Sequence, residues 1–193
     1  RVDISMTRPS GLNTTPLLIG EIGVSPGHDK ETALKLVDEL SSAKFDFAKL
    51  QIFDIPELVL PTAKSGDHFN ETSVINAYKK MQFPWEHVAE IRERCAQRSI
   101  QFMASIFGLS SLEFVKQFNP SHWKIASFEL NCLDLLEAVA AEEGTIILST
   151  GMGSLGDIEL AIKTLEDNGK SDIALLHCVS SYPAEPEDYN AAI

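Results

Sequence analysis

A lysine, a serine and a glutamate lie close together in the stretch WKIASFELN, residues 123–131. If this apolar run is a buried strand, Lys124 is a cation at its end, and Ser127 and Glu129 follow within a few residues. Burying an ammonium group costs several kcal/mol unless an anion lies beside it. The sequence leaves two partners open: Glu129, in a structural ion pair, or an anionic substrate.

A second lysine lies in the stretch DFAKLQIF, where Phe47, Lys49 and Gln51 share one face of a strand by the period of two. Ser149 stands at the end of a further apolar run. Lysines supply point charges and hydroxyl groups supply directed hydrogen bonds. This set of side chains would therefore suit a ligand that carries both a phosphate and a carboxylate.

Several of these candidates also have a purely structural explanation. Gln51 could be a hydrogen-bonded interior amide, and Tyr182 could be a packed aromatic before a turn proline. The turn STGMG, residues 149–153, could be rich in glycine for its backbone shape alone. His177 lies in an apolar run, which favours a hydrogen-bonded core histidine over a ligand. The other four of the five histidines have no metal-ligand spacing among them.

The composition is typical of a globular protein: 193 residues, 44% hydrophobic and 23% charged. A net charge of −12 argues against nucleic acid or an anionic membrane surface as the main partner. The three cysteines form no CxxC motif, which is typical of reduced thiols in a cytoplasmic protein. The sequence has no apolar run near the roughly 20 residues that span a bilayer, and its first residues have no signal-peptide pattern. We therefore expect a cytoplasmic protein that acts on small molecules.

Short apolar runs alternate with amphipathic segments along the chain. The predicted strands are residues 16–24, 46–53, 100–106, 123–131, 145–149 and 173–178, and the predicted helices are residues 30–43, 85–98, 110–118, 133–142 and 158–168. Residues 54–83 are predicted to be a long polar insertion, of a kind that is more often a functional loop than filler. This alternation predicts a parallel sheet with right-handed crossovers.

Two architectures fit such a sheet, an eight-fold barrel and an open doubly wound sheet. The GxGxxG fingerprint is absent after the first strand, which argues against the dinucleotide-binding form of the open sheet. Polar residues at or just beyond several strands favour a TIM (β/α)8-type barrel, which keeps its active site at that end. A complete barrel usually needs about 250 residues. We therefore expect residues 1–193 to form one truncated barrel domain, with about six strands and five helices.

Five short motifs, taken together, resemble one enzyme family. In order they are Glu21-Ile22-Gly23, Lys49-Leu50-Gln51-Ile52-Phe53, Lys124-Ile125-Ala126-Ser127-Phe128-Glu129, Ser149-Thr150-Gly151-Met152 and Leu176-His177-Cys178-Val179-Ser180-Ser181-Tyr182-Pro183. Their order and spacing resemble the sialic acid synthase family, the N-acetylneuraminate, legionaminate and pseudaminate synthases. The resemblance runs from about residue 16 to the end of the chain. His177-Cys178 is more similar to the neuraminate and legionaminate branches than to the pseudaminate branch.

The resemblance implies an enzyme that joins phosphoenolpyruvate to an open-chain N-acylated amino sugar such as N-acetylmannosamine. The products would be a nine-carbon α-keto acid and phosphate. The residues that would hold phosphoenolpyruvate are Lys49, Lys124, Ser127, Ser149 and Ser180, the last standing where some members have asparagine. Those that would meet the sugar are Gln51, Glu129 and Tyr182. The catalytic carboxylates implied in this way are Glu21, as the proton-transfer candidate, and Glu129.

The sequence also departs from the family. Ser25-Pro26 stand where the family usually has an Asn-His pair, which puts local contacts of the first loop in doubt. The family's two metal-binding histidines lie on later segments, and this chain lacks their Gly-x-Ser-Asp-His-type motif. It also lacks the antifreeze-like domain, which gives an arginine to the partner subunit's site. The resemblance therefore implies a divalent metal (Mn or Mg) with ligands outside this chain, a homodimer for the full-length protein, and an inactive fragment.

Three other functions stay open. Another phosphoenolpyruvate–aldose condensing enzyme would use the same residue types. So would a Schiff-base aldolase with Lys49 or Lys124 as its nucleophile. Outside enzymes, the alternative is a barrel that binds an anion or a sugar acid without turnover.

Overall fold

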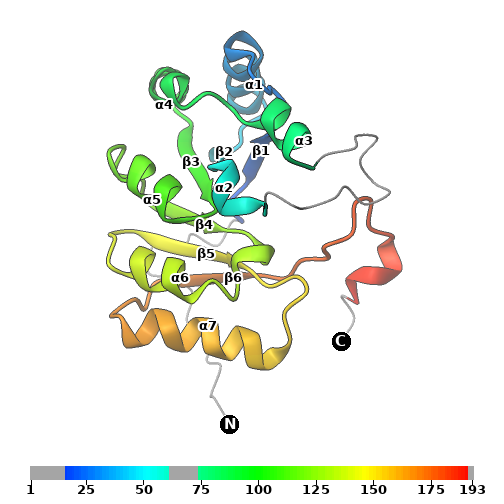
Figure 1. Cartoon of the computed structure of the whole chain (residues 1–193). Coiled ribbons are helices and arrows are strands. Elements are labelled where there is room, and N and C mark those ends of the chain that lie inside the picture. Colours follow the sequence, from blue (N-terminus) through cyan, green and yellow to red (C-terminus); the bar gives the residue numbers. More distant parts are fainter. Residues whose placement is uncertain (1–15, 61–73, 191–193) are drawn as a thin grey trace.

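Six parallel strands form the centre of the molecule in the computed structural model, which describes residues 16–60 and 74–190. The strands are β1 (Ile19–Gly23), β2 (Phe47–Ile52), β3 (Gln101–Ile106), β4 (His122–Ile125), β5 (Thr145–Ser149) and β6 (Ile173–Leu176). They lie side by side in chain order, from β1 to β6 (Figure 1). A doubly wound sheet has its first strand in the interior of the sheet, whereas chain order is typical of a barrel. The predicted fold class, a TIM (β/α)8-type barrel that is incomplete in this chain, is confirmed.

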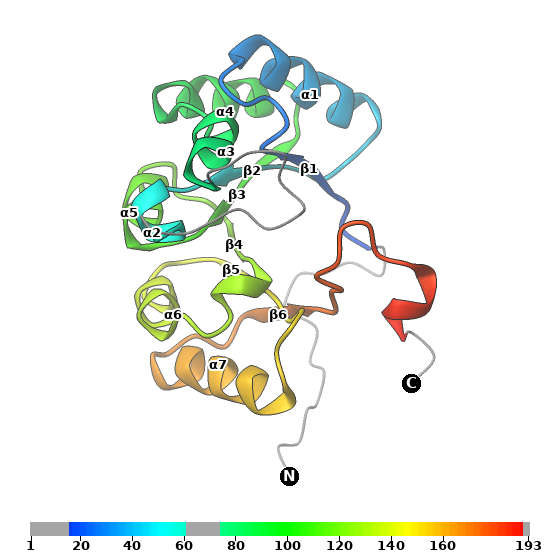
Figure 2. The ribbon, with the colours of Figure 1, turned by 45° about the vertical axis from the view of Figure 1, so that its right-hand side comes forward.

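Helices connect the strands and cover the outer face of the sheet. The α-helices are α1 (Lys30–Ser42), α2 (Ile55–Leu58), α3 (Val74–Met81), α4 (Val88–Gln97), α5 (Leu109–Lys116), α6 (Leu133–Ala140) and α7 (Leu155–Asp167), and the 3₁₀ turns are η1 (Trp85–His87), η2 (Ser127–Glu129) and η3 (Pro186–Tyr189). Figure 2 shows the helices in an arc around the strands, with the segment after β6 on the open side. In the described part of the chain, no helix has the length and apolar character needed to cross a membrane.

Strand β2 presents alternate residues to two different apolar clusters. Leu50 and Ile52 of β2 face outward and belong to the large cluster between the sheet and the helices. Phe47 of the same strand faces inward. The buried residues of the inner cluster are Phe47, Met103 and Ile147. Because side chains alternate along a strand, Lys49 follows Phe47 on the inner face, above this apolar layer.

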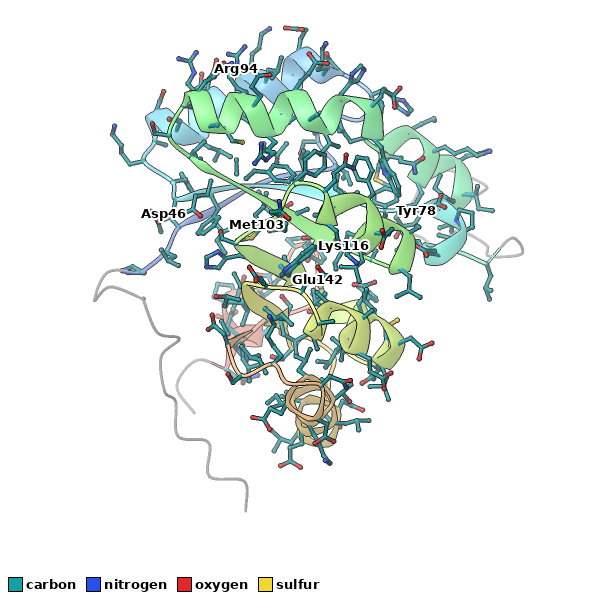
Figure 3. All side chains as sticks on the ribbon, turned by 90° about the vertical axis from the view of Figure 1, so that its left-hand side faces the viewer. Asp46, Tyr78, Arg94, Met103, Lys116 and Glu142 are labelled. Carbon is teal, nitrogen blue, oxygen red and sulfur yellow. The ribbon has the colours of Figure 1, made fainter. Side chains whose placement is uncertain are left out.

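Ion pairs join neighbouring helices on the outer surface. Asp38 of α1 lies 3.0 Å from Arg94 of α4 and 2.7 Å from Arg98. Lys116 of α5 lies 3.0 Å from Glu142, beyond the end of α6, and Figure 3 shows these two side chains next to each other. Partly exposed pairs of this kind contribute about 0–1 kcal/mol each. The apolar clusters therefore hold the sheet and helices together.

The predicted polar insertion at residues 54–83 is wrong in part, because it contains α2 and α3. The α3 segment VINAYKKM has an apolar face, and Ala77 on it is buried. Proline and the polar residues around these short helices hid them from the periodicity analysis. Residues 61–73 lie outside the described residues.

The strand predicted at residues 123–131 is also wrong in part, because β4 ends at Ile125. The backbone N–H of Glu129 donates to the carbonyl of Ala126 at 3.1 Å, which closes the turn η2. Ser127 and Glu129 therefore lie on a turn just beyond the strand end. That position brings both side chains to the opening of the partial barrel.

Candidate active site

All nine residues singled out in the sequence line one cavity at the carboxyl ends of the strands. The cavity has a volume of about 720 Å³. A barrel carries its active site at this end of the sheet. The nine residues are Glu21, Lys49, Gln51, Lys124, Ser127, Glu129, Ser149, Ser180 and Tyr182.

Lys124 of β4 lies deep in this cavity and is only 7% exposed. Its ammonium group donates to Ser149 Oγ at 2.7 Å and to the backbone carbonyl of Ile125 at 2.6 Å. The ion pair with Glu129 that the sequence left open does not form between these two described residues. Burial, and after it the positive charge of Lys49, lowers the pKa of Lys124 to about 8.

Lys49 of β2 is the second buried cation of the cavity, 8% exposed. Its ammonium group forms an ion pair with Glu21, the register partner of Lys49 on β1. It also donates to Ser105 Oγ at 3.2 Å. The Glu21 side chain is 48% exposed. An anion that reaches Lys49 must therefore share the ammonium group with this carboxylate or displace it.

Glu129 is the buried carboxyl group of the cavity wall. It is 7% exposed, and its Oε2 atom has no hydrogen-bond partner among the described residues. Burial raises the pKa of Glu129 to about 7, and the nearby charge of Lys124 offsets this effect only in part. A carboxyl group with this pKa can both donate and accept a proton near neutral pH.

The turn after β5 brings two hydroxyl groups and a backbone amide together. The N–H of Gly151 donates to Ser127 Oγ at 3.1 Å. A Cβ atom at this glycine would lie 2.4 Å from Ser180 Oγ and 2.9 Å from Ser127 Oγ. The close approach of these serines therefore leaves no room for a side chain at position 151, so the glycine is needed for its small size and not only for backbone flexibility. Small directed donors gathered in this way suit phosphate oxygens.

Two side chains for which the sequence offered a packed position lie at the surface. Tyr182 is 89% exposed at the cavity opening, so of its two alternatives the packed aromatic is wrong. His177 is exposed one residue beyond the end of β6, so the prediction of a core histidine is wrong. Its Nε2 atom donates to the backbone carbonyl of Tyr189 at 2.7 Å, so its ring is hydrogen-bonded, as expected.

Other residues line the same cavity without a role predicted from the sequence, among them Ser105, Phe128 and Cys178. Ser105 is 2% exposed and is the register partner of Lys124. The period of two along β3, which puts Met103 and Ser105 on one face, is a signal that could have found it. Phe128 and Cys178 gave no such signal, because aromatic residues and thiols in apolar segments usually belong to a core.

The residues of the cavity do not fit a divalent metal by themselves. Divalent metals are bound by sets of several carboxylate, imidazole or thiolate ligands. Among residues 16–60 and 74–190, no three such side chains come close enough together to hold a metal ion. We therefore derive no step through a metal from these residues.

The chain is similar to proteins of one known family. The model of the NeuB family matches residues 36–193. The chain belongs to the NeuB family. The family resemblance read from the five sequence motifs is confirmed. The likeness extends to solved structures: the N-acetylneuraminic acid (sialic acid) synthetase of Leptospira borgpetersenii superposes with a TM-score of 0.80 at 32% identity, over 91% of this chain and 59% of that one.

Two curated relatives show how much of a NeuB-family protein this chain represents. The N,N'-diacetyllegionaminic acid synthase of Campylobacter jejuni is 31% identical over 181 residues, 90% of this chain and 54% of that protein. The N-acetylneuraminate-9-phosphate synthase of Drosophila melanogaster is 30% identical over 175 residues, 89% of this chain and 47% of that protein. The chain therefore spans about half the length of the curated relatives it matches.

Proposed function

We propose that the full-length protein condenses phosphoenolpyruvate with an N-acylmannosamine-type amino sugar. The products are a nine-carbon, sialic-acid-like α-keto acid and phosphate. The observation that carries this proposal is the pair of buried ammonium groups, from Lys49 and Lys124, in one cavity of a NeuB-family barrel. Two buried like charges repel each other, so the arrangement calls for an anion of more than one charge.

The donor would be held by charge and by directed hydrogen bonds. Lys124 lies beside Ser149, and Ser127 and Ser180, which both approach Gly151, line the same cavity. Phosphoenolpyruvate carries a phosphate and a carboxylate on three carbons, so one lysine can neutralise each end. Binding both ends fixes the enol carbon that must react, which lowers the entropy cost of the bimolecular step.

The chemistry proposed for this site forms one carbon–carbon bond and replaces the C2–O bond to phosphate by a C2–O bond to an oxygen atom from water. C3 of the donor attacks the aldehyde carbon of the open-chain sugar, whose oxygen becomes an alkoxide and takes up a proton. C2 becomes cationic and is captured by water, which loses a proton. The resulting tetrahedral centre expels phosphate and leaves the α-keto acid.

Two carboxyl groups of the cavity are our candidates for handling these protons. We assign Glu129 as the group that donates a proton to the alkoxide, because its pKa of about 7 keeps a proton available near neutral pH. We assign the proton of the attacking water to Glu21, which is half-exposed beside Lys49. Gln51 and Tyr182, at the same cavity, would orient the hydroxyl groups of the sugar.

The proposal has four further parts. It requires a divalent metal, Mn or Mg, with ligands from outside the described residues. It includes a location in the cytoplasm, which suits free thiols such as the exposed Cys132. The full-length protein would be a homodimer, and residues 1–193 would be inactive by themselves.

The proposal is tested by following phosphate release from phosphoenolpyruvate by the full-length protein. With Mn²⁺ or Mg²⁺ present, we expect release only when an N-acylmannosamine is added, together with a product whose mass equals the sum of donor and acceptor plus water minus phosphoric acid. Release that does not need the sugar, or no release with any N-acylated amino sugar, contradicts the proposal. Donor binding without turnover under all these conditions would support a non-catalytic anion-binding barrel.

The lowered pKa of Lys124 favours one second candidate, a Schiff-base aldolase. A neutral amine can attack the carbonyl of pyruvate and lose water to form an imine. Borohydride reduction in the presence of pyruvate would trap this imine. A covalent adduct on Lys124 in the mass spectrum would support the aldolase, and an unmodified lysine would support the condensation.

A further inference from the structure

Phe128 is a large apolar side chain that stands exposed at the opening of the cavity. It lies in η2 between two polar residues of the site, Ser127 and Glu129, and is 71% exposed. Its two neighbours are both held in place: Ser127 accepts a hydrogen bond from Gly151, and Glu129 is buried. The turn thus presents the aromatic ring to the cavity opening while its polar groups face the interior.

Exposed apolar side chains stand at the rim of the cavity, above its buried lysines and serines. Leu60 and Tyr182 line this rim with Phe128, and they are 74% and 89% exposed. Deeper in the cavity, the lysines and serines lie beside buried apolar residues such as Phe53. These lysines and serines match the charged donor, but nothing in a three-carbon phosphate ester matches an aromatic rim. An apolar rim near buried charged groups is suited to a ligand that is polar at its reacting end and apolar elsewhere.

We propose that Phe128 forms an apolar subsite for the N-acyl group of the acceptor sugar, and so determines acceptor specificity. This inference rests on the proposed function, since it concerns the second substrate of that reaction. The acyl chain is the apolar part of an open-chain N-acylated amino sugar, because every other carbon carries a hydroxyl, an aldehyde or nitrogen. Covering the exposed ring with a polyol would strip water from hydroxyl groups without replacing their hydrogen bonds.

The inference predicts a dependence on acyl chain length. Each methylene buried against an apolar surface favours binding by about fourfold. We therefore expect kcat/KM to rise by up to about fourfold from N-acetylmannosamine to N-propanoylmannosamine, and again to N-butanoylmannosamine. The variant Phe128→Ser should remove most of this progression, because a serine hydroxyl offers no apolar surface. Phe128→Leu should restore most of it.

The experiment uses the full-length protein and measures kcat/KM for the three acyl homologues and KM for phosphoenolpyruvate. Leu155→Ser is the matched control, because Leu155 is 78% exposed near the same end of the molecule and does not line the cavity. We expect Phe128→Ser to change the ratios between acceptors while leaving the donor KM within about twofold of its original value. A purely structural role for Phe128 would affect all acceptors, and the donor, alike.

Three results would overturn the inference. They are an unchanged acyl-chain progression in Phe128→Ser, a parallel loss for donor and acceptors, and a change of oligomeric state, which would mean that another subunit covers the ring. If no condensation occurs, the proposed function fails separately, and the subsite is tested by titration calorimetry with the same three sugars. Binding that tightens with chain length only when Phe128 is present supports the subsite, and equal or no binding overturns it.

Discussion

Lys49 and Lys124 bring their ammonium groups into one cavity from strands that are not neighbours. Strand β3 lies between them, and its Ser105 is both the register partner of Lys124 and a hydrogen-bond partner of Lys49, at 3.2 Å. The charge of Lys49 contributes to the lowered pKa of Lys124. Such an arrangement costs stability in the free protein, which is typical of a site built for an anionic ligand.

Removing the charge of Lys124 should weaken donor binding. We expect Lys124→Met to lower the affinity of the full-length protein for phosphoenolpyruvate by about 2–4 kcal/mol, the usual range for one member of a buried charged contact. Titration calorimetry measures this change. Lys170→Met is the matched control, because Lys170 is also buried, at 8% exposure, but donates to the backbone carbonyl of Glu142 away from the cavity. An unchanged affinity in Lys124→Met would remove Lys124 from the donor site.

Donor binding should also depend on alkaline pH. Lys124 loses its proton as the pH rises through about 8. The phosphate of the donor is already doubly ionised in this range. The affinity should therefore fall by up to about tenfold per pH unit above the pKa of Lys124, as one proton must be taken up on binding. The same titration from pH 7 to pH 10 should be flat in Lys124→Met, and a flat profile in the unaltered protein would contradict the assignment.

Removing the charge of Glu21, the ion-pair partner of Lys49, should have opposite effects on donor binding and on turnover. In Glu21→Gln the carboxylate no longer competes with the ligand for the Lys49 ammonium group. We expect phosphoenolpyruvate to bind more tightly, by about 1 kcal/mol or more, while phosphate release in the complete reaction falls by about 100-fold or more. Weaker donor binding in this variant would show that Glu21 holds Lys49 in its binding position.

The close approach at Gly151 predicts a steric effect on the phosphate end of the donor. A methyl group at this position would displace the hydroxyls of Ser127 and Ser180. Gly151→Ala should therefore weaken phosphoenolpyruvate binding by about tenfold or more, corresponding to about 1.4 kcal/mol. Gly156→Ala is the control: its Cβ meets no atom closer than 3.7 Å, and in helix α7 the change should stabilise the fold by about 0.5–1 kcal/mol without affecting the donor. Equal donor affinity in both variants would show that the serines beside Gly151 do not hold the donor.

Part of the site could be predicted from sequence patterns, because alternation along strands is a local property. The period of two puts Lys49 on the same face of its strand as Phe47, and polar residues at the ends of several strands favour a barrel with these groups at one end. Ser180 comes from the family resemblance, and the structure shows that the face of Lys49 is the inner one. The ion pair of Lys49 with Glu21 could not be predicted, because it depends on the register between β1 and β2, where a bulge follows Glu21. Register is set by the tertiary packing of the whole sheet.

The end of β4 and the helix α3 show the second limit of the sequence analysis. Residues 123–131 read as one apolar run, yet the chain leaves the sheet after Ile125. The turn η2 forms where the pairing of β4 with β5 stops, because the Glu129 N–H there donates a hydrogen bond to the carbonyl of Ala126. Helix α3 lies in a segment whose polar composition masked one short apolar face. In both places tertiary packing decided between locally similar alternatives.

The buried carboxyl group of Glu129 should make the stability of the fold depend on pH. Its folded-state pKa of about 7 lies above the ordinary value of 4.5, so the folded protein binds more protons than the unfolded chain between these two values. The free energy of unfolding should therefore fall as the pH rises from about 4.5 through about 7, by on the order of 1–3 kcal/mol. Glu129→Gln cannot ionise, so its stability relative to the unaltered protein should rise by that amount between pH 5 and pH 8.

Urea unfolding at the two pH values measures this difference. The exposed helix residue Glu159, changed to Gln, is the control and should leave the pH dependence unaltered. The same difference in both variants would mean that Glu129 ionises in the folded protein as easily as a surface carboxylate does.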